Sequence, residues 1–269
     1  IAQPSPSTET PKIDLRICGS ESTRATFNQV DKVKTPDATD TWKPIGHTFL
    51  IDKVKNRLEA TGFSVENEAH NLARNGQRYF GLFQVTHKDR QSNERGTILG
   101  LRNAHDKCFP AGLCAGDAPF VCDNLVFHNE VVLARRHTKN ILKDLDQVIA
   151  RTLGKLFGMW NTQDNRIDAY KDRTLTNAEA NDIVIRSYQA NAIGKTQIAD
   201  VINQWEASDH PEFWDRNVNS LYNAYTEVYK GNINALPKRC EALHSVLDAE
   251  VEFIPTKDCL LYTSDAADE

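Results

Sequence analysis

The densest group of reactive side chains in the sequence follows the ends of predicted strands. His105 and Asp106 come after one apolar run, Asp123 after a second, and His137 after a third. If these strands are neighbours, the four side chains converge on one rim of a sheet. Two His and two Asp suit a divalent metal ion, and a His–Asp pair suits general base work. We therefore take His105, Asp106, Asp123 and His137 as candidate catalytic residues.

Two other interpretations of the same rim stay open. Asn and Asp at strand ends commonly bond their own backbone, so the group is also expected in a purely structural role. Alternatively, the rim binds a polyanion, because Arg grips phosphate through a bidentate fork and Lys supplies a point charge. The nucleic-acid-binding candidates are then Arg102, Asn103, Asn124, Arg135, Arg136 and Lys139.

The charge distribution supports the polyanion interpretation. The whole chain has a formal net charge of −5, which argues against a nucleic-acid binder when taken globally. Residues 70–160, however, hold thirteen Lys/Arg against eight Asp/Glu, whereas the remainder holds 19 against 29. Five of the eight His fall in the same window. Such asymmetry is typical of a polyanion-facing surface on an acidic body, or of a solvated face without a partner.

No familiar cofactor or metal motif accompanies these residues. The six Cys include no C-x-x-C pair, and their spacings match no zinc pattern. Gly194-Lys195-Thr196 lacks the preceding strand and glycine of a phosphate-binding loop. We predict no metal site and no cofactor.

The elements that position the rim can be read from hydrophobic periodicity. A helix is predicted at 48–61, strands at 63–65, 79–85, 97–102, 120–122 and 131–134, and a long helix at 139–158. Because the linkers are short, antiparallel hairpins are favoured over crossovers. The fold class predicted is α+β: a mainly antiparallel sheet packed by helices, followed by a helical C-terminal region.

The second half of the chain is predicted to be helical. Thr176-Asn177-Ala178-Glu179 is a capping box that opens one helix, and Ile198 to Trp205 marks the next. Tyr222, Tyr225 and Tyr229 follow at helical spacing, which favours a place in the core over a base-stacking platform.

Length and composition bound the class of protein. With 269 residues and 40% hydrophobic content, the chain suits one large domain or one domain with an appendage. It has no apolar run long enough to span a membrane and no signal-peptide pattern, so we expect a cytoplasmic protein with reduced thiols and no membrane partner. The oligomeric state is not predicted.

Four segments are expected along the chain. They are an extended lead-in at 1–46, an α+β core domain at 47–160, a helical region at 161–258 and a foreign tail at 259–269. The tail, Cys259 to Glu269, resembles the read-through of a sequencing-library adapter in a metagenomic assembly.

Several long motifs resemble the domain of unknown function 932 family, whose members are often labelled phage/plasmid-like proteins. The resemblance covers about residues 36–253, with Ala104 and Cys108 at positions where the family usually has Ser. The motifs are Arg78–Leu82, Gly100–Lys107, Phe120–Leu125, Ala134–Thr138, Tyr222–Val228 and Ala242–His244.

The resemblance implies genes of mobile elements and a role in DNA metabolism or host–element conflict, and it supplies no catalytic residues. We therefore predict a non-enzymatic, DNA-associated accessory protein that binds or anneals single strands. The alternatives are a metal-dependent hydrolase or nuclease using the strand-end His/Asp cluster, and a module that binds a host defence or replication protein.

Overall fold

The computed structural model describes residues 12–15, 22–88, 95–119, 126–208, 210–229 and 236–255. Its centre is a six-stranded antiparallel sheet in which neighbours along the chain are neighbours in space. The strands are β1 (Ser22–Ala25), β2 (Phe63–Ala73), β3 (Arg78–His87), β4 (Arg95–Ala104), β5 (Ala111–Pro119) and β6 (Val126–Arg135). The α+β fold and the antiparallel sheet predicted from the sequence are confirmed.

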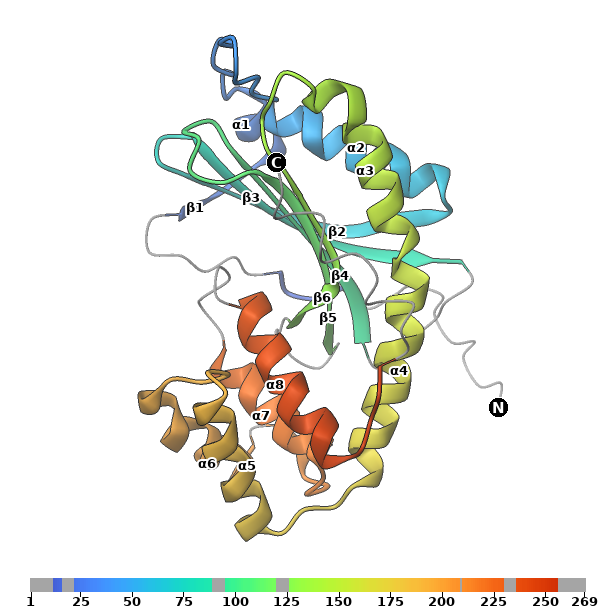
Figure 1. Ribbon diagram of the computed structural model, residues 1–269, viewed down its shortest axis with the longest axis vertical. Helices are drawn as coiled ribbons and strands as arrows, with labels where there is room; N and C mark the ends of the chain where they lie inside the picture. Colours follow the sequence, from blue (N-terminus) through green and yellow to red (C-terminus); the bar gives the residue numbers. More distant parts are fainter. Residues whose placement is uncertain are drawn as a thin grey trace, which may run out of the picture.

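Helices cover one face of this sheet (Figure 1). They are α2 (His47–Ala60), α3 (Ile141–Gly154) and the start of α4 (Leu156–Asp172). Side chains repeat about every 3.6 residues on one side of a helix and every second residue on one face of a strand. Apolar residues on one side of α2 and α3 therefore pack on alternate residues of the strands. The resulting cluster includes Leu50 and Ile51 of α2, Phe83 of β3, Leu99 of β4 and Leu145 of α3.

The opposite face of the sheet packs against the helical half of the chain. Ile13 and Leu15 lie against Leu82 and Ile98 of the strands and belong to the same cluster as the C-terminal helices. The segment is fixed by the amide of Ile13, which donates to Gln84 Oε1 at 2.9 Å. The sheet is thus covered on both sides over its middle part.

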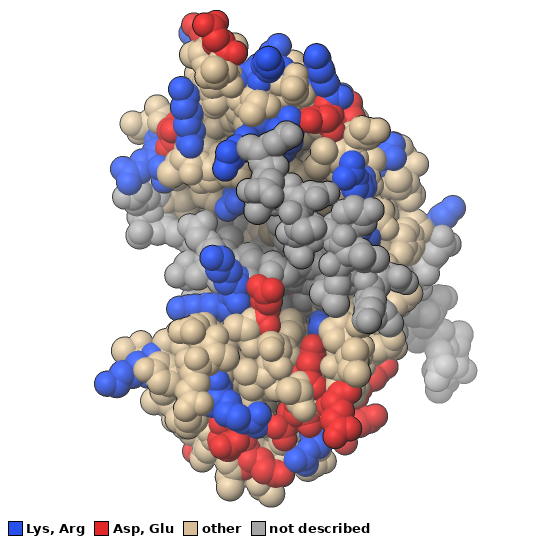
Figure 2. Space-filling model, viewed as in Figure 1, with Lys and Arg blue, Asp and Glu red and all other residues tan. Residues whose placement is uncertain are grey.

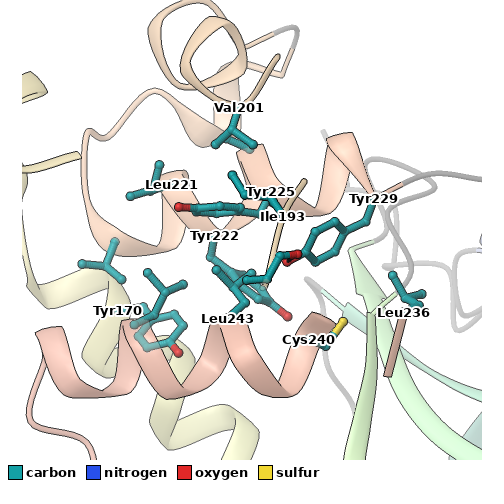
Figure 3. Packing of buried hydrophobic residues seen from close by; sticks show 14 of the residues in the cluster. Tyr170, Ile193, Val201, Leu221, Tyr222, Tyr225, Tyr229, Leu236, Cys240 and Leu243 are labelled. Atoms are coloured by element: carbon teal, nitrogen blue, oxygen red, sulfur yellow. Dashed lines mark hydrogen bonds between the residues drawn. The ribbon is translucent and has the colours of Figure 1, made fainter. Parts of the chain in front are cut away.

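The helical half contains α5 (Asn177–Gln189), α6 (Ile198–Glu206), α7 (Val218–Val228) and α8 (Leu236–Glu250), with two single 3-10 turns at Lys195–Gln197 and Pro211–Phe213. The predicted capping box at Thr176 and Glu179 is present. Figure 3 shows the labelled tyrosines 170, 222, 225 and 229 within the core of the helical half, where Tyr225 OH donates to Ser187 of α5 and Tyr229 OH to Ala192 O. Tyr222, Tyr225 and Tyr229 are buried, which confirms their predicted place in the core.

Several element boundaries differ from those predicted. Residues 22–31, expected in an extended lead-in, form β1 and the short helix α1 (Phe27–Asp31). The helix predicted at 139–158 is two helices that meet at Lys155, and α4 continues past residue 160. Strand β5 was not predicted, and the strand expected at 120–122 lies outside the described residues, as does the tail at 259–269.

The division into domains stays a prediction. Helix α4 runs through the expected boundary at 160 and contributes Trp160 to one hydrophobic cluster and Tyr170 to the other. Among the described residues, no helix has the length and hydropathy needed to cross a membrane. Cys108, Cys114 and Cys240, the cysteines whose side chains are described, are free thiols.

Candidate nucleic-acid interface

The ends of β4 and β6 lie at the same end of the sheet, on either side of the start of β5. Arg102 is the Cα partner of Gly112, and Ala111 is the partner of Arg135. The predicted neighbours at 102–106 and 135–138 are therefore brought together. The end of β5, at Pro119, is paired with Arg95 at the opposite end of the sheet. Asp123 and Asn124 follow it and lie outside the described residues.

A buried polar cluster underlies this end of the sheet. The Asn103 side-chain amide donates to Ile45 O at 2.9 Å and lies 3.0 Å from His47 Nδ1. His47 Nε2 donates to Gly76 O at 2.8 Å, and His105 Nε2 donates to Ile45 O at 2.9 Å. Because these carbonyls only accept, each Nε2 carries a proton. Asn103 and His105, both predicted site residues, thus hold the segment before α2 against the end of β4.

His137 completes the cluster from the segment after β6. Its carbonyl accepts from Lys43 N at 2.8 Å, and its buried Nε2 has no hydrogen-bond partner in the structure. Burial, together with the neighbouring His105, lowers the pKa of His47 and of His137 to about 4, although at His47 the hydrogen bond to Gly76 opposes the shift. Burial also lowers the pKa of His105. The ring of His137 is thus neutral near pH 7, so it adds no positive charge next to the basic side chains of this region.

Two of the predicted site residues are held in ion pairs. Arg78 Nε donates to Asp106 Oδ2 at 2.6 Å, and hydrogen bonds from Arg78 and the Cys108 amide hold the pKa of Asp106 below its usual range, although burial opposes them. Arg135 grips Asp144 of α3 through two bonds, from Nε at 3.0 Å and from Nη2 at 2.9 Å. Asp106 and Arg135 therefore serve first to fix the turn after β4 and the start of α3.

Trp42 lies at the surface with a lysine over its ring. Lys107 Nζ lies 4.8 Å from the centre of the Trp42 ring, and the His137 ring lies 6.3 Å from it. Lys43 follows Trp42 in the chain, Arg136 precedes His137 and Lys139 lies two residues after it; all three side chains are exposed. We call this surface the basic edge; it comprises Trp42 with Lys43, Lys107, Arg136 and Lys139.

The electrostatic setting of the basic edge is mixed but favours anions. Asp37 and Asp40 are exposed in the segment that leads to Trp42. Asp106 and Asp144 are each neutralised by an arginine. Most acidic side chains visible in Figure 2 lie on the helical half, whereas the half that contains the sheet shows mainly basic ones. On this face the sheet half is therefore the more basic of the two.

The predicted His/Asp metal site finds no matching arrangement in the part of the chain that is described. Over those residues, no three His, Cys, Asp or Glu side chains gather closely enough to hold a metal ion. His105 and His137 are close to each other, but Asp106 is bound to Arg78.

Sequence reasoning missed Trp42, Lys43 and His47 as neighbours of this site. They belong to the segment before and at the start of α2, which is held at the sheet end by the His105 side chain donating to Ile45 O and by Lys43 N donating to His137 O. Lys107 belongs to the motif Gly100–Lys107 and lies next to Asp106, and that position was the signal available in the sequence. In the structure its side chain is exposed.

Comparison with known families identifies the chain at this point. Residues 38–245, more than half of the sequence, match the family described as Domain of unknown function (DUF932). The chain belongs to the DUF932 family. The DUF932 match begins just before Trp42 and ends within α8, so it includes the whole basic edge. No curated protein matches the chain, and no solved structure matches it.

Proposed function

We propose that this DUF932 protein binds single-stranded DNA at the basic edge and acts as a non-enzymatic accessory protein of a mobile element, in strand protection or annealing. The contact couples phosphate neutralisation by the exposed lysines and arginine with base stacking on Trp42. Proteins that bind single strands without sequence preference combine a cationic track with aromatic side chains in this way.

The arrangement of Trp42 and Lys107 carries the proposal. The indole is only partly buried, and a lysine ammonium lies over it at cation–π distance. The backbone that carries the indole is fixed, because Thr39 N donates to Trp42 O at 2.8 Å and Lys43 N donates to His137 O at 2.8 Å. An aromatic ring that is already ordered beside cations can stack a base with little further loss of conformational entropy.

The distribution of ion pairs supports the same surface. Arg135 is paired with Asp144. We therefore assign the phosphate contacts to Lys43, Lys107, Arg136 and Lys139. All four side chains are exposed. A DNA single strand that contacts these side chains passes over Trp42. Lys107 lies over the Trp42 ring, and Lys43 is the residue after Trp42 in the chain.

The test is the binding of a fluorescent oligothymidylate of about 20 nucleotides, which gives each bound protein a full site. Trp42→Leu is expected to weaken binding about 5- to 100-fold, since one stacked base contributes about 1–3 kcal/mol. Trp214→Leu is the matched control, because Trp214 is 63% exposed on the helical half.

Absence of binding by the parent protein at low salt would overturn the proposal, and the protein-partner hypothesis would replace it. Equal weakening by Trp42→Leu and Trp214→Leu would also overturn it, because the loss would then not belong to the basic edge.

A further inference from the structure

A row of side chains crosses the helical-half face of the sheet, close to the basic edge. Strand register pairs Arg24 with Asn71, Asn71 with Phe80, and Phe80 with Arg102. Directly paired residues of antiparallel strands point to the same side, so the four side chains lie on one face. With strands about 4.8 Å apart, the row is about 14 Å long.

The β4–β5 turn adds a second aromatic ring to this row. Phe109 lies with its ring centre 5.4 Å from that of Phe80, and the Arg102 guanidinium lies 5.3 Å from the Phe109 ring centre. Gly112, beside Arg102 on β5, makes room for this arrangement. A Cβ at Gly112 would come within 2.9 Å of Arg102 Nε and 3.1 Å of its Cγ. The absence of a side chain thus lets the arginine stem lie flat on the sheet.

The two aromatic rings of this row lie outside the hydrophobic core, although Asn71 between the strands is buried. The middle of the same face is covered by Ile13 and Leu15, which belong to one hydrophobic cluster with Leu82 and Ile98. Phe80 and Phe109 belong to neither of the two buried clusters and are partly exposed. The two phenylalanines thus leave part of their ring surface open to a ligand beside the Arg102 guanidinium.

The charge around the two rings selects the kind of ligand. Arg24 is exposed at the far end of the row, and Arg102 lies between the rings and the edge of β5. The neighbouring carboxylate, Asp106, is neutralised by Arg78. Planar apolar faces flanked by cations fit unpaired bases joined by phosphates, whereas a purely apolar peptide would leave the arginines unmatched.

We infer that Phe80, Phe109 and Arg102 form a base-stacking platform for the same single strand that the basic edge binds. The inference rests on the proposed function. Lys107 and Phe109 are two residues apart in one turn, so a strand leaving Trp42 reaches the platform by passing around that turn. Aromatic residues on an exposed sheet face stack two or three bases in other nucleic-acid-binding domains.

The experiment compares two probes of equal length, an oligothymidylate and an oligomer of abasic nucleotides. Both carry the phosphates, but only the first carries bases. The double variant Phe80→Leu with Phe109→Leu is expected to bind the oligothymidylate about 5- to 100-fold more weakly and the abasic oligomer as the parent does. Phe157→Leu is the control, because that ring is 43% exposed and packs on His87 at the other end of the sheet.

The outcomes separate this inference from the proposed function. If the parent binds neither probe, the proposed function fails and the platform fails with it. If the parent binds and Trp42→Leu weakens binding, but the double variant binds the oligothymidylate normally, the platform alone is overturned. Equal loss on both probes also overturns it. Should the double variant not fold, Phe109→Leu alone, in the turn outside the strands, gives the same comparison.

Discussion

The imidazole rings of His47 and His105 are stacked, with centroids 4.0 Å apart and planes inclined by 7°. Two protonated rings at this distance would repel each other. His47 Nδ1 also faces the Asn103 amide nitrogen, so a proton there would meet a donor rather than an acceptor. The pair that supports the basic edge is therefore stable only while both rings are neutral.

This cluster makes the protein sensitive to acid. The pKa of His47 and that of His137 are each about 4 in the folded chain, against 6.5 for an exposed histidine. Above pH 6.5 both states are neutral, and stability does not depend on these rings. Between pH 6.5 and 4 the unfolded chain binds more protons, so the free energy of unfolding falls by about 2 kcal/mol per ring at pH 5.

His137→Phe tests this prediction. The variant lacks one of the rings whose pKa burial lowers, and it loses no side-chain hydrogen bond at Nε2. Urea unfolding at pH 8, 7, 6 and 5 is expected to show a loss between pH 7 and 5 that is smaller than in the parent by about 2 kcal/mol. The same loss in both proteins would show that His137 does not titrate with folding, and pH 8 gives the reference for each variant.

A buried ion pair joins α4 to α8. Arg166 donates to both carboxylate oxygens of Asp248, at 2.9 and 3.1 Å, and Tyr170 OH donates to Asp248 Oδ1 at 2.6 Å. Asp248→Asn removes the negative charge from this buried pair, so we expect the free energy of unfolding to fall by about 3–5 kcal/mol. Denaturant unfolding measures it.

Asp182→Asn is the matched control for that change. Asp182 pairs with Arg186 one helical turn away, with 68% of its side chain exposed. An exposed pair of this kind contributes about 0.5 kcal/mol or less. Equal effects of the two substitutions would show that burial of the Arg166–Asp248 pair has no consequence for stability.

Arg135 and Asp144 are expected to act as one unit. Their two hydrogen bonds tie the end of β6 to the first turns of α3, but 40% of the Asp144 side chain is exposed. Arg135→Ala and Asp144→Ala should each cost about 0.5–1 kcal/mol, and the double variant should cost less than their sum. Strict additivity in this double-mutant cycle would mean that the pair has no net coupling.

Much of the fold follows from periodicity in the sequence. Strands β3 and β4 were predicted from apolar runs that are largely buried on both faces, such as Gly81 to Val85. Helices α5, α6 and α7 were predicted from a capping box and apolar spacing. These elements carry their signal locally, because each buries a regular pattern of side chains.

Strand β5 could not be predicted in the same way. Its described side chains are mostly small, with Ala111, Gly112, Ala115 and Gly116 among them, and such residues have little preference for strands. Pairing with β4 and β6 on both edges decides their conformation. Packing therefore overrides local preference here.

The site was predicted only in part for a related reason. Strand ends at 102–106 and 135–137 were expected to meet, and the register brings them together. Trp42 and Lys43 come from a segment without periodicity, and only the buried bonds of Asn103 and His105 to Ile45 O place it there. Phe80 and Phe109 become a pair only through the turn after β4. Contacts of this kind depend on the tertiary fold.

The salt dependence of DNA binding tests the central claim most directly. Arg136→Ala with Lys139→Ala removes two exposed cations of the basic edge, and Lys195→Ala with Lys238→Ala removes two exposed cations of the helical half. We predict that the first variant flattens the slope of log affinity against log salt by about 1.4 units, at about 0.7 per phosphate contact on a single strand. The second variant should keep the parent's slope. Equal slopes for all three proteins would contradict the basic edge as the DNA-binding surface.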